Sequence, residues 1–138
     1  MIYTVTFNPA IDYVVHTDAM TVGDVNRSSG EEIYFGGKGI NVSMVLKELD
    51  VPSRALGFLA GFTGTAIEQG LQADGIDTDF VHLDAGFTRI NVKIKAGTET
   101  ELNGRGPEIP AEKLEKLFQK LDALQDGDTL ILAGSIPS

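Results

Sequence analysis

Hydrophobic and polar residues alternate along the chain in blocks that predict strands and helices in turn. Residues 2–7 alternate β-branched and aromatic side chains and end at the turn signal Asn8-Pro9, which predicts a first strand. Short strands are predicted at residues 13–15 and 33–35, on either side of a polar loop. A further strand is predicted at residues 53–59.

Three segments show the spacing of three and four residues that is typical of a helix with one buried side. The first places Val42, Val45, Leu46 and Leu49 on one stripe and ends at Asp50-Val51-Pro52. The second spans residues 63–74 and ends at Gly75. The third opens at Pro110, and its apolar stripe consists of Leu114, Leu117, Phe118, Leu121 and Leu124.

The segment at residues 87–95 alternates like a half-exposed strand. It places Ile90, Val92 and Ile94 on one face and Arg89, Asn91, Lys93 and Lys95 on the other, and we expect Lys93 and Lys95 to be solvated. A glycine turn then leads into residues 98–103, which predicts a hairpin. Residues 129–133 form a continuous apolar run, as strands of parallel sheets do.

The order of these elements predicts an α/β layer with an antiparallel flap attached to it. We expect a single unit over residues 1–138, with flap segments at about residues 12–35 and 87–103 inserted into it. The apolar strand at residues 129–133 has no helix after it to cover its face. We therefore expect the chain to be the N-terminal part of a larger fold, or a partner to supply the cover.

Composition narrows the possible functions. The chain of 138 residues carries a net charge of −9, which argues against nucleic acid as a partner, because such binding depends on basic residues. No apolar run approaches the roughly 20 residues that cross a membrane, and the N-terminus lacks the features of a signal peptide. A cytoplasmic protein without a membrane partner is expected. The chain has no cysteine, and its two histidines are isolated, so we expect no metal site in it.

The stretch Gly36-Gly37-Lys38-Gly39 lies directly before the first predicted helix. The free amides and positive end of a helix N-terminus favour an anion, and Lys38 adds a full charge, so a phosphate or a sugar hydroxyl could bind here. The spacing fits neither a Walker A loop nor a dinucleotide fingerprint. A glycine-rich turn with a solvated Lys38 is the alternative that these residues leave open.

Four stretches together resemble one known family: NPAID (residues 8–12), GGKGINVS (36–43), TRINVKI (88–94) and AGSIPS (133–138). They occur in the order found in the ribokinase-like (PfkB) sugar kinases, and the likeness runs through the whole chain. The resemblance implies a three-layer α/β/α fold, incomplete here, with a small β lid that closes over the sugar. In this family the lid often forms the interface of a homodimer.

The resemblance also implies roles for eight residues. Asp12 would hold sugar hydroxyls, and Gly36, Gly37, Lys38 and Asn41 would line the substrate cleft. The phosphate already on the sugar would be bound by Arg27, Lys38 and Arg89, and Ser138 would touch the substrate from the last loop. Without the resemblance, Asp12 could satisfy a turn, Arg27 and Arg89 could be solvated, and Asn41 could be a first-turn residue without a ligand.

The catalytic aspartate of the family lies in a Gly-x-Gly-Asp element, which does not occur in these 138 residues. We therefore expect no catalytic residue in this chain, and we expect ATP and Mg²⁺ to be bound mainly by a segment that it lacks.

The implied activity is ATP-dependent phosphorylation of the 6-hydroxyl of fructose 1-phosphate. The alternatives within the family are kinases for tagatose 6-phosphate or fructose 6-phosphate. An alternative of another class is a non-catalytic module for sugar-phosphate binding or dimerisation.

Overall fold

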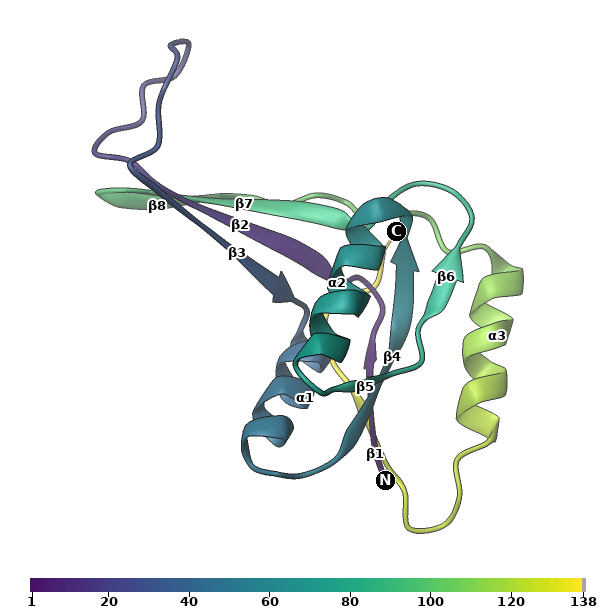
Figure 1. Ribbon diagram of the computed structural model, residues 1–138. Helices are drawn as coiled ribbons and strands as arrows, with labels where there is room; N and C mark the ends of the chain where they lie inside the picture. Colours follow the sequence, from purple (N-terminus) through teal and green to yellow (C-terminus); the bar gives the residue numbers. More distant parts are fainter. Residues whose placement is uncertain (138) are drawn as a thin grey trace.

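The computed structural model describes residues 1–137, which form two β-sheets and three helices. The main sheet contains β1 (Ile2–Thr6), β4 (Ser53–Ala60), β5 (Asp77–Thr78), β6 (Val81–Leu83) and β9 (Thr129–Leu132). Its strand order is β5-β4-β1-β9, with β6 also paired to β4, and every pairing is parallel. Figure 1 shows the second sheet projecting from one end of this body.

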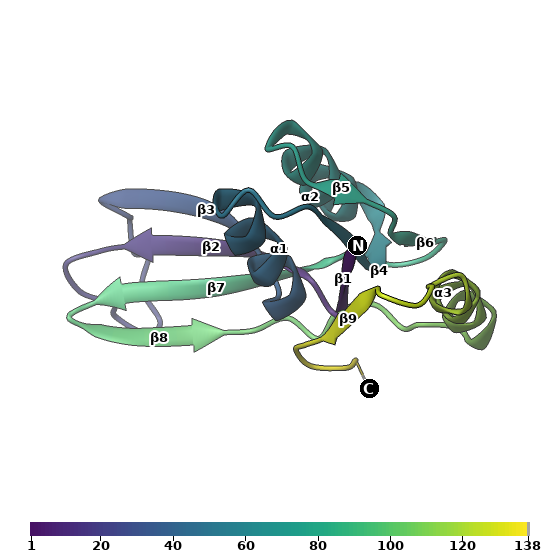
Figure 2. The ribbon, with the colours of Figure 1, turned by 90° about the horizontal axis from the view of Figure 1, so that it is seen from below.

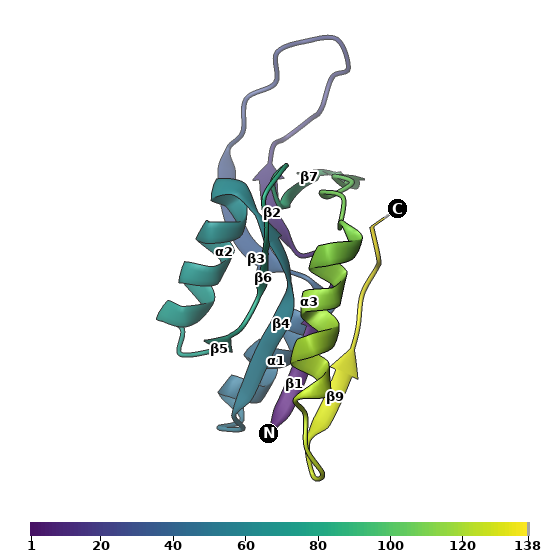
Figure 3. The same ribbon diagram turned by 90° about the vertical axis from the view of Figure 1, so that its right-hand side faces the viewer.

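Helices cover both faces of the main sheet. Helices α1 (Lys38–Glu48) and α2 (Gly61–Ala73) pack on one face, where Ile40, Leu59 and Ile67 share a buried core. Helix α3 (Ala111–Asp122) packs on the other face, where Leu117 joins a core built around Phe58. Figures 2 and 3 show α3 on the side of the sheet opposite to α2. The expected three-layer α/β/α arrangement is therefore confirmed for this part of the fold.

The second sheet, which we call the lid, has the strand order β3-β2-β7-β8. Its strands are β2 (Ala10–His16), β3 (Gly30–Gly36), β7 (Arg89–Ala96) and β8 (Thr98–Leu102). The β3-β2 and β7-β8 pairs are antiparallel, as a flap of hairpins predicts, but the central β2-β7 pair is parallel. The expectation of a wholly antiparallel flap is thus wrong. In the chain, β2 follows β1 and β7 follows β6, and both strands run outward from the main sheet (Figure 2).

The register of the lid separates a polar face from an apolar face. Tyr34, Asp12 and Asn91 lie side by side in one row across three strands. In the neighbouring row, Ile33, Tyr13, Val92 and Leu102 lie side by side on the opposite face, since successive residues of a strand alternate. The polar face borders the start of α1, whereas Phe35 and Ile11 pack against the core beneath α2.

Several sequence-based boundaries need correction. The predicted strands at 13–15 and 33–35 are the middles of two seven-residue strands, so Asp12 lies within β2 and does not satisfy a turn. Strands β5 and β6 were not predicted, because they are only two and three residues long.

The predicted buried stripe of the first helix is also wrong. Val45 and Leu49 are 54% and 66% exposed, and the buried residues of α1 are Gly39, Ile40 and Ser43. Helix α1 lies so close to β1 that small side chains form its contact face: Ser43 Oγ lies 2.7 Å from Thr4 Oγ1. The three-and-four pattern of the sequence cannot distinguish this close packing from an apolar stripe. Within residues 1–137, no helix is long and apolar enough to cross a membrane.

Candidate functional site

A polar cleft of about 280 Å³ lies between the start of α1, the polar face of the lid and the loop after β9. It lies beyond the carboxyl ends of β1 and β9, the usual place for ligands in open α/β sheets. Segments far apart in the sequence line it: Thr6, Asn8, Ala10, Asp12, Gly37, Lys38, Asn41, Arg89, Asn91, Lys93, Glu101, Asn103, Gly134 and Ser135.

The glycines before α1 let the helix start directly against β1. Gly37 has a φ of 127°, which favours glycine, and a Cβ there would lie 2.5 Å from Thr6 Cγ2. A Cβ on Gly39 would overlap Thr6 Oγ1 and lie 2.8 Å from the Val5 carbonyl oxygen. Thr6 Oγ1 in turn accepts a hydrogen bond from the Ile40 amide, at 3.0 Å. This packing brings the exposed side chains of Lys38 and Asn41 to the cleft.

Asp12 projects from β2 into the cleft, and one of its carboxylate oxygens accepts a hydrogen bond from a neighbouring side chain. Its Oδ1 accepts a hydrogen bond from Asn91 Nδ2, at 3.2 Å. A Cβ on Gly36 would lie 2.5 Å from Asp12 Oδ2, so the absence of a side chain at Gly36 leaves room for this carboxylate. The carboxylate can accept further hydrogen bonds from ligand hydroxyl groups.

Arg89 enters the cleft from the start of β7 and is half-buried. Its Nε donates to the Asn8 carbonyl oxygen at 3.1 Å, and its Nη1 donates to the Gly104 carbonyl oxygen at 3.4 Å. The Asn8 side chain is itself held by a 3.0 Å bond from Nδ2 to the Arg105 carbonyl oxygen. A guanidinium has five N–H donors, so Arg89 keeps donors for an anionic ligand.

Lys93 lies on the same face of β7 as Arg89, beyond Asn91, and its Nζ lies 4.0 Å from Glu101 Oε1. It lines the cleft with its side chain 32% exposed, so it is partly solvated and also faces the candidate site. The cleft residues Lys38, Arg89 and Lys93 outnumber the carboxylates of Asp12 and Glu101. The cleft is thus locally cationic in a chain with a net charge of −9, as anion binding requires.

Further along the same face, Glu32 accepts hydrogen bonds from two side chains. The Tyr34 hydroxyl donates to Oε2 at 2.5 Å, and His16 Nε2 lies 2.7 Å from Oε1. The Tyr34 bond, followed by the His16 bond, holds the pKa of Glu32 below its ordinary value. This cluster is exposed and lies outside the cleft.

Five of the eight predicted site residues line this one cleft: Asp12, Gly37, Lys38, Asn41 and Arg89. Gly36 lies behind Asp12. Arg27 does not join them, because it lies with Val92 and Ile94 at the apolar face of the lid. Ser138 is outside the described residues, although Gly134 and Ser135 of the same loop line the cleft. The ligand roles of all eight residues remain predictions.

Sequence reasoning missed Thr6, Asn8, Asn91, Glu101 and Asn103 as lining residues. The strand alternation did place Asn91 and Lys93 on the same face as Arg89. The alternation shows which residues share a face of the strand, but it does not show that this face borders a cleft.

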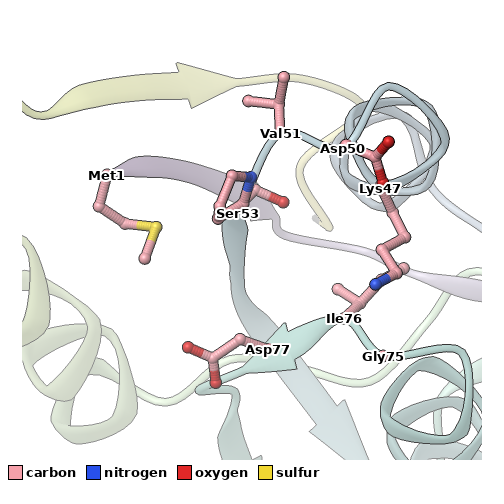
Figure 4. A pocket seen from close by; sticks show the side chains of 9 residues that line it. Met1, Lys47, Asp50, Val51, Ser53, Gly75, Ile76 and Asp77 are labelled. Atoms are coloured by element: carbon pink, nitrogen blue, oxygen red, sulfur yellow. The ribbon is translucent and has the colours of Figure 1, made fainter.

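A second hollow, of about 310 Å³, lies at the opposite ends of β1 and β4 (Figure 4). Lys47 of α1 and Asp77 of β5 both line it. Asp77 Oδ2 accepts a 2.7 Å hydrogen bond from Arg54 Nε. This hollow lies at the amino ends of the strands, and polar groups do not converge in it as they do in the cleft. Among residues 1–137, no group of three or more side chains is placed to hold a metal ion.

The parallel sheet, the separate lid and the charged cleft between them define an α/β protein with a candidate ligand cleft at the carboxyl edge of its sheet. The family model described as "pfkB family carbohydrate kinase" matches residues 5–138. The chain belongs to this family, as the four sequence stretches indicated.

Curated relatives agree with this assignment. The chain is 53% identical over 138 residues to the 1-phosphofructokinase of Bacillus subtilis (strain 168). It is 40% identical over 137 residues to the D-tagatose-1-phosphate kinase of Bacillus licheniformis. The alignments cover 100% and 99% of this chain but 45% of each relative, so the chain spans about half the length of the relatives it matches.

A solved structure that is described as a phosphofructokinase from Staphylococcus aureus superposes on this chain with a TM-score of 0.93 at 49% sequence identity. The superposition covers all of this chain and 45% of the solved chain. The chain also resembles ribokinase from Thermotoga maritima in fold alone. The TM-score is 0.64 at 18% identity, over 76% of this chain and 36% of the ribokinase chain. The ribokinase-like fold expected from the sequence is confirmed.

Proposed function

We propose that this chain carries the substrate-binding side of a kinase that transfers phosphate from ATP to the 6-hydroxyl of fructose 1-phosphate. The observation that carries this proposal is the cationic cleft, in which Asp12, Lys38 and Arg89 converge from three separate elements. A phosphorylated sugar needs both a cationic group and hydroxyl acceptors. The 53% identity to a protein named 1-phosphofructokinase supports this choice of sugar.

The proposed roles are those that the family resemblance implies for the residues of the cleft. Asp12 accepts hydrogen bonds from sugar hydroxyls, while Lys38 and Arg89 bind the phosphate already on the sugar. Gly36 and Gly37 allow the sugar to approach the backbone, and Asn41 adds a polar group from the first turn of α1. Arg27 was also predicted to bind the phosphate. Within one chain it lies at the other face of the lid, away from the cleft, so we do not assign this contact to it.

Kinases of this family use ATP and Mg²⁺, which supply the transferred phosphoryl group and neutralise its developing charge. The described residues do not fit as the site for either: they lack a Gly-x-Gly-Asp element and a cluster of possible metal ligands. We propose that residues outside these 138 hold both. The contribution of this chain is then to bind and orient the sugar and to limit the access of water.

Two alternatives keep the chemistry and change the sugar. The relative named D-tagatose-1-phosphate kinase, at 40% identity, supports a tagatose phosphate as an alternative substrate. Fructose 6-phosphate is the other alternative. A non-catalytic module that binds sugar phosphates is the alternative of another class.

The test is a coupled assay of phosphate transfer from ATP by the protein purified at its full encoded length. Fructose 1-phosphate, tagatose 1-phosphate, tagatose 6-phosphate and fructose 6-phosphate are compared by kcat/KM. The proposal predicts the highest value for fructose 1-phosphate. A higher value for another sugar would replace the substrate, and binding without transfer to any of the four would favour the non-catalytic module.

We also propose that two copies pair through the apolar faces of their lids. Ile33 is 63% exposed, Leu102 is 72% exposed, and both lie in one row with Tyr13 and Val92. An apolar sheet face of this kind is a common site of protein association. The pairing would cover the hollow that Arg27 lines.

A further inference from the structure

Asn91 is a buried polar residue of β7 to which neither the family resemblance nor the proposed ligand contacts assign a role. Its side chain is 8% exposed, and it lies directly opposite Asp12 in the parallel β2-β7 pairing. A buried amide is costly to leave without hydrogen bonds. Asn91 has them on both of its polar atoms, and both partners belong to the surroundings of the cleft.

These two bonds fix the direction of the amide. The Gly104 backbone N–H donates to Asn91 Oδ1 at 3.1 Å, so the acceptor side of the amide is turned toward the loop after β8. The donor side, Nδ2, is thereby turned toward Asp12 Oδ1, 3.2 Å away. Asp12 consequently faces a neutral donor, which suits a carboxylate.

Gly104 also holds Arg89, through its other backbone group. Its carbonyl oxygen accepts the 3.4 Å bond from Arg89 Nη1. A Cβ on Gly104 would lie 3.0 Å from both Arg89 Cβ and the Ile90 carbonyl oxygen, so the loop packs tightly against the start of β7. Gly104 therefore connects Arg89, through its carbonyl group, with Asn91 and Asp12, through its amide group.

We propose that Asn91 is a positioning residue for sugar binding: it holds the Asp12 carboxylate and links it through Gly104 to Arg89. This inference rests on the proposed function, because it assigns Asp12 to the sugar hydroxyls and Arg89 to the phosphate. The network fixes the spacing between the two contacts. A change at position 91 therefore affects sugar binding through Asp12 and Arg89.

The first test variant is Asn91→Leu, which has a similar size and no donor. In the full-length enzyme, we expect its KM for fructose 1-phosphate to rise about tenfold or more, on the scale of one lost hydrogen bond to a charged group. The KM for ATP should stay within twofold. The control is Lys95→Leu, which makes the same substitution at an exposed position of the same strand face and should leave both constants nearly unchanged.

The second variant, Asn91→Asp, keeps the shape and the acceptor for Gly104 but donates to Asp12 only while its new carboxyl group is protonated. Its KM defect should therefore shrink as the pH falls and grow as it rises, since two facing carboxylates repel each other. The other charged groups at the cleft, Lys38, Arg89, Lys93 and Glu101, are the same in every variant. Comparing the KM of each variant with that of the parent at each pH removes their effect. The KM of Asn91→Leu relative to the parent should not change with pH.

Three results would overturn the inference. If the parent is active and both variants keep KM within threefold, Asn91 does not position Asp12. If kcat and both KM values change together in proportion to a loss of folded protein, the role of Asn91 is structural only; Asn91→Asp decides this where Asn91→Leu does not fold. A parent that transfers phosphate to no ketohexose phosphate would refute the proposed function itself, and the inference with it.

Discussion

At the scale of single residues, the cleft depends on a glycine that leaves room for its neighbour's side chain. Gly36 ends β3 beside Asp12, and the nearest atom to a Cβ there would be Asp12 Oδ2, at 2.5 Å. We predict that Gly36→Ala displaces this carboxylate and raises the KM for the phosphosugar by about tenfold, on the scale of one hydrogen bond to a charged group. Steady-state kinetics measures the change.

Gly30→Ala at the other end of β3 is the matched control. A Cβ on Gly30 would meet no atom closer than His16 Cδ2, at 3.8 Å, which is ordinary van der Waals contact. We expect the kinetics of this variant to equal those of the parent. Equal kinetics for Gly36→Ala as well would show that Asp12 does not bind the sugar in the position described here.

At the scale of elements, the sequence predicted most of the secondary structure and less of the packing. The strong periodic segments became α1, α2, α3, β1, β4, β7 and β9, with boundaries shifted by one to a few residues. The parallel β2-β7 pairing was missed, because it joins segments about 80 residues apart and each strand alone looks like part of a hairpin. The exposed Val45 and Leu49 were misassigned because periodicity shows that a face is apolar and does not show what covers it.

The sequence predicted only those residues of the candidate site that belong to the motif stretches. The motif stretches contain Asp12, Gly37, Lys38, Asn41 and Arg89, which all line the cleft. Asn91 and Lys93 lie in the same TRINVKI stretch, but their contacts are to Glu101 in the neighbouring strand β8 and to Gly104 in the loop after it. Such contacts arise from tertiary packing, which no spacing within the stretch encodes.

The junction of β1 and β9 gives a prediction at this scale. Asp128 accepts a hydrogen bond from the Gln125 amide at 2.9 Å and pairs with the Met1 amino group at 3.1 Å. The Gln125 bond, followed by the Met1 bond, lowers the pKa of Asp128 below its ordinary value of 3.8. A lowered pKa means that the folded state holds the proton less tightly than the unfolded state. The stability from Asp128 is therefore present above pH 3.8 and is lost as the pH falls through the folded-state pKa.

We expect Asp128→Asn to unfold at a lower urea concentration than the parent at pH 7. The difference should narrow as the pH falls below 3.8, where the parent side chain also becomes neutral. Asp126→Asn, at an exposed position in the same turn, is the control and should show little difference at either pH. A difference that stays constant from pH 7 to pH 3 would contradict this explanation.

At the scale of the whole molecule, the two faces of the lid have different surroundings. Its polar face borders the cleft, and its opposite face exposes Ile33 and Leu102. We predict a dimer in analytical ultracentrifugation at micromolar concentration. Ile33→Asp should shift it toward monomer, because a carboxylate would be buried without a partner.

Lys95→Asp places the same acidic group on the polar face of the same sheet and should leave the dimer intact. A parent protein that sediments as a monomer would refute the pairing. Dissociation by both variants alike would show that the effect does not come from the apolar face.

The central claim is that this cleft binds a sugar phosphate through Arg89, and one kinetic comparison tests it most directly. Arg89→Ala in the full-length enzyme should lower kcat/KM for fructose 1-phosphate by about 30-fold or more, the effect of losing roughly 2 to 4 kcal/mol from a charged pair. The KM for ATP should change little, and the exposed Lys95→Ala should lose much less. Arg89→Lys should recover part of the activity, since it keeps the charge and loses the planar fork. If Arg89→Ala stays folded and keeps its kinetics within about twofold of the parent, the cleft does not bind the phosphate as described.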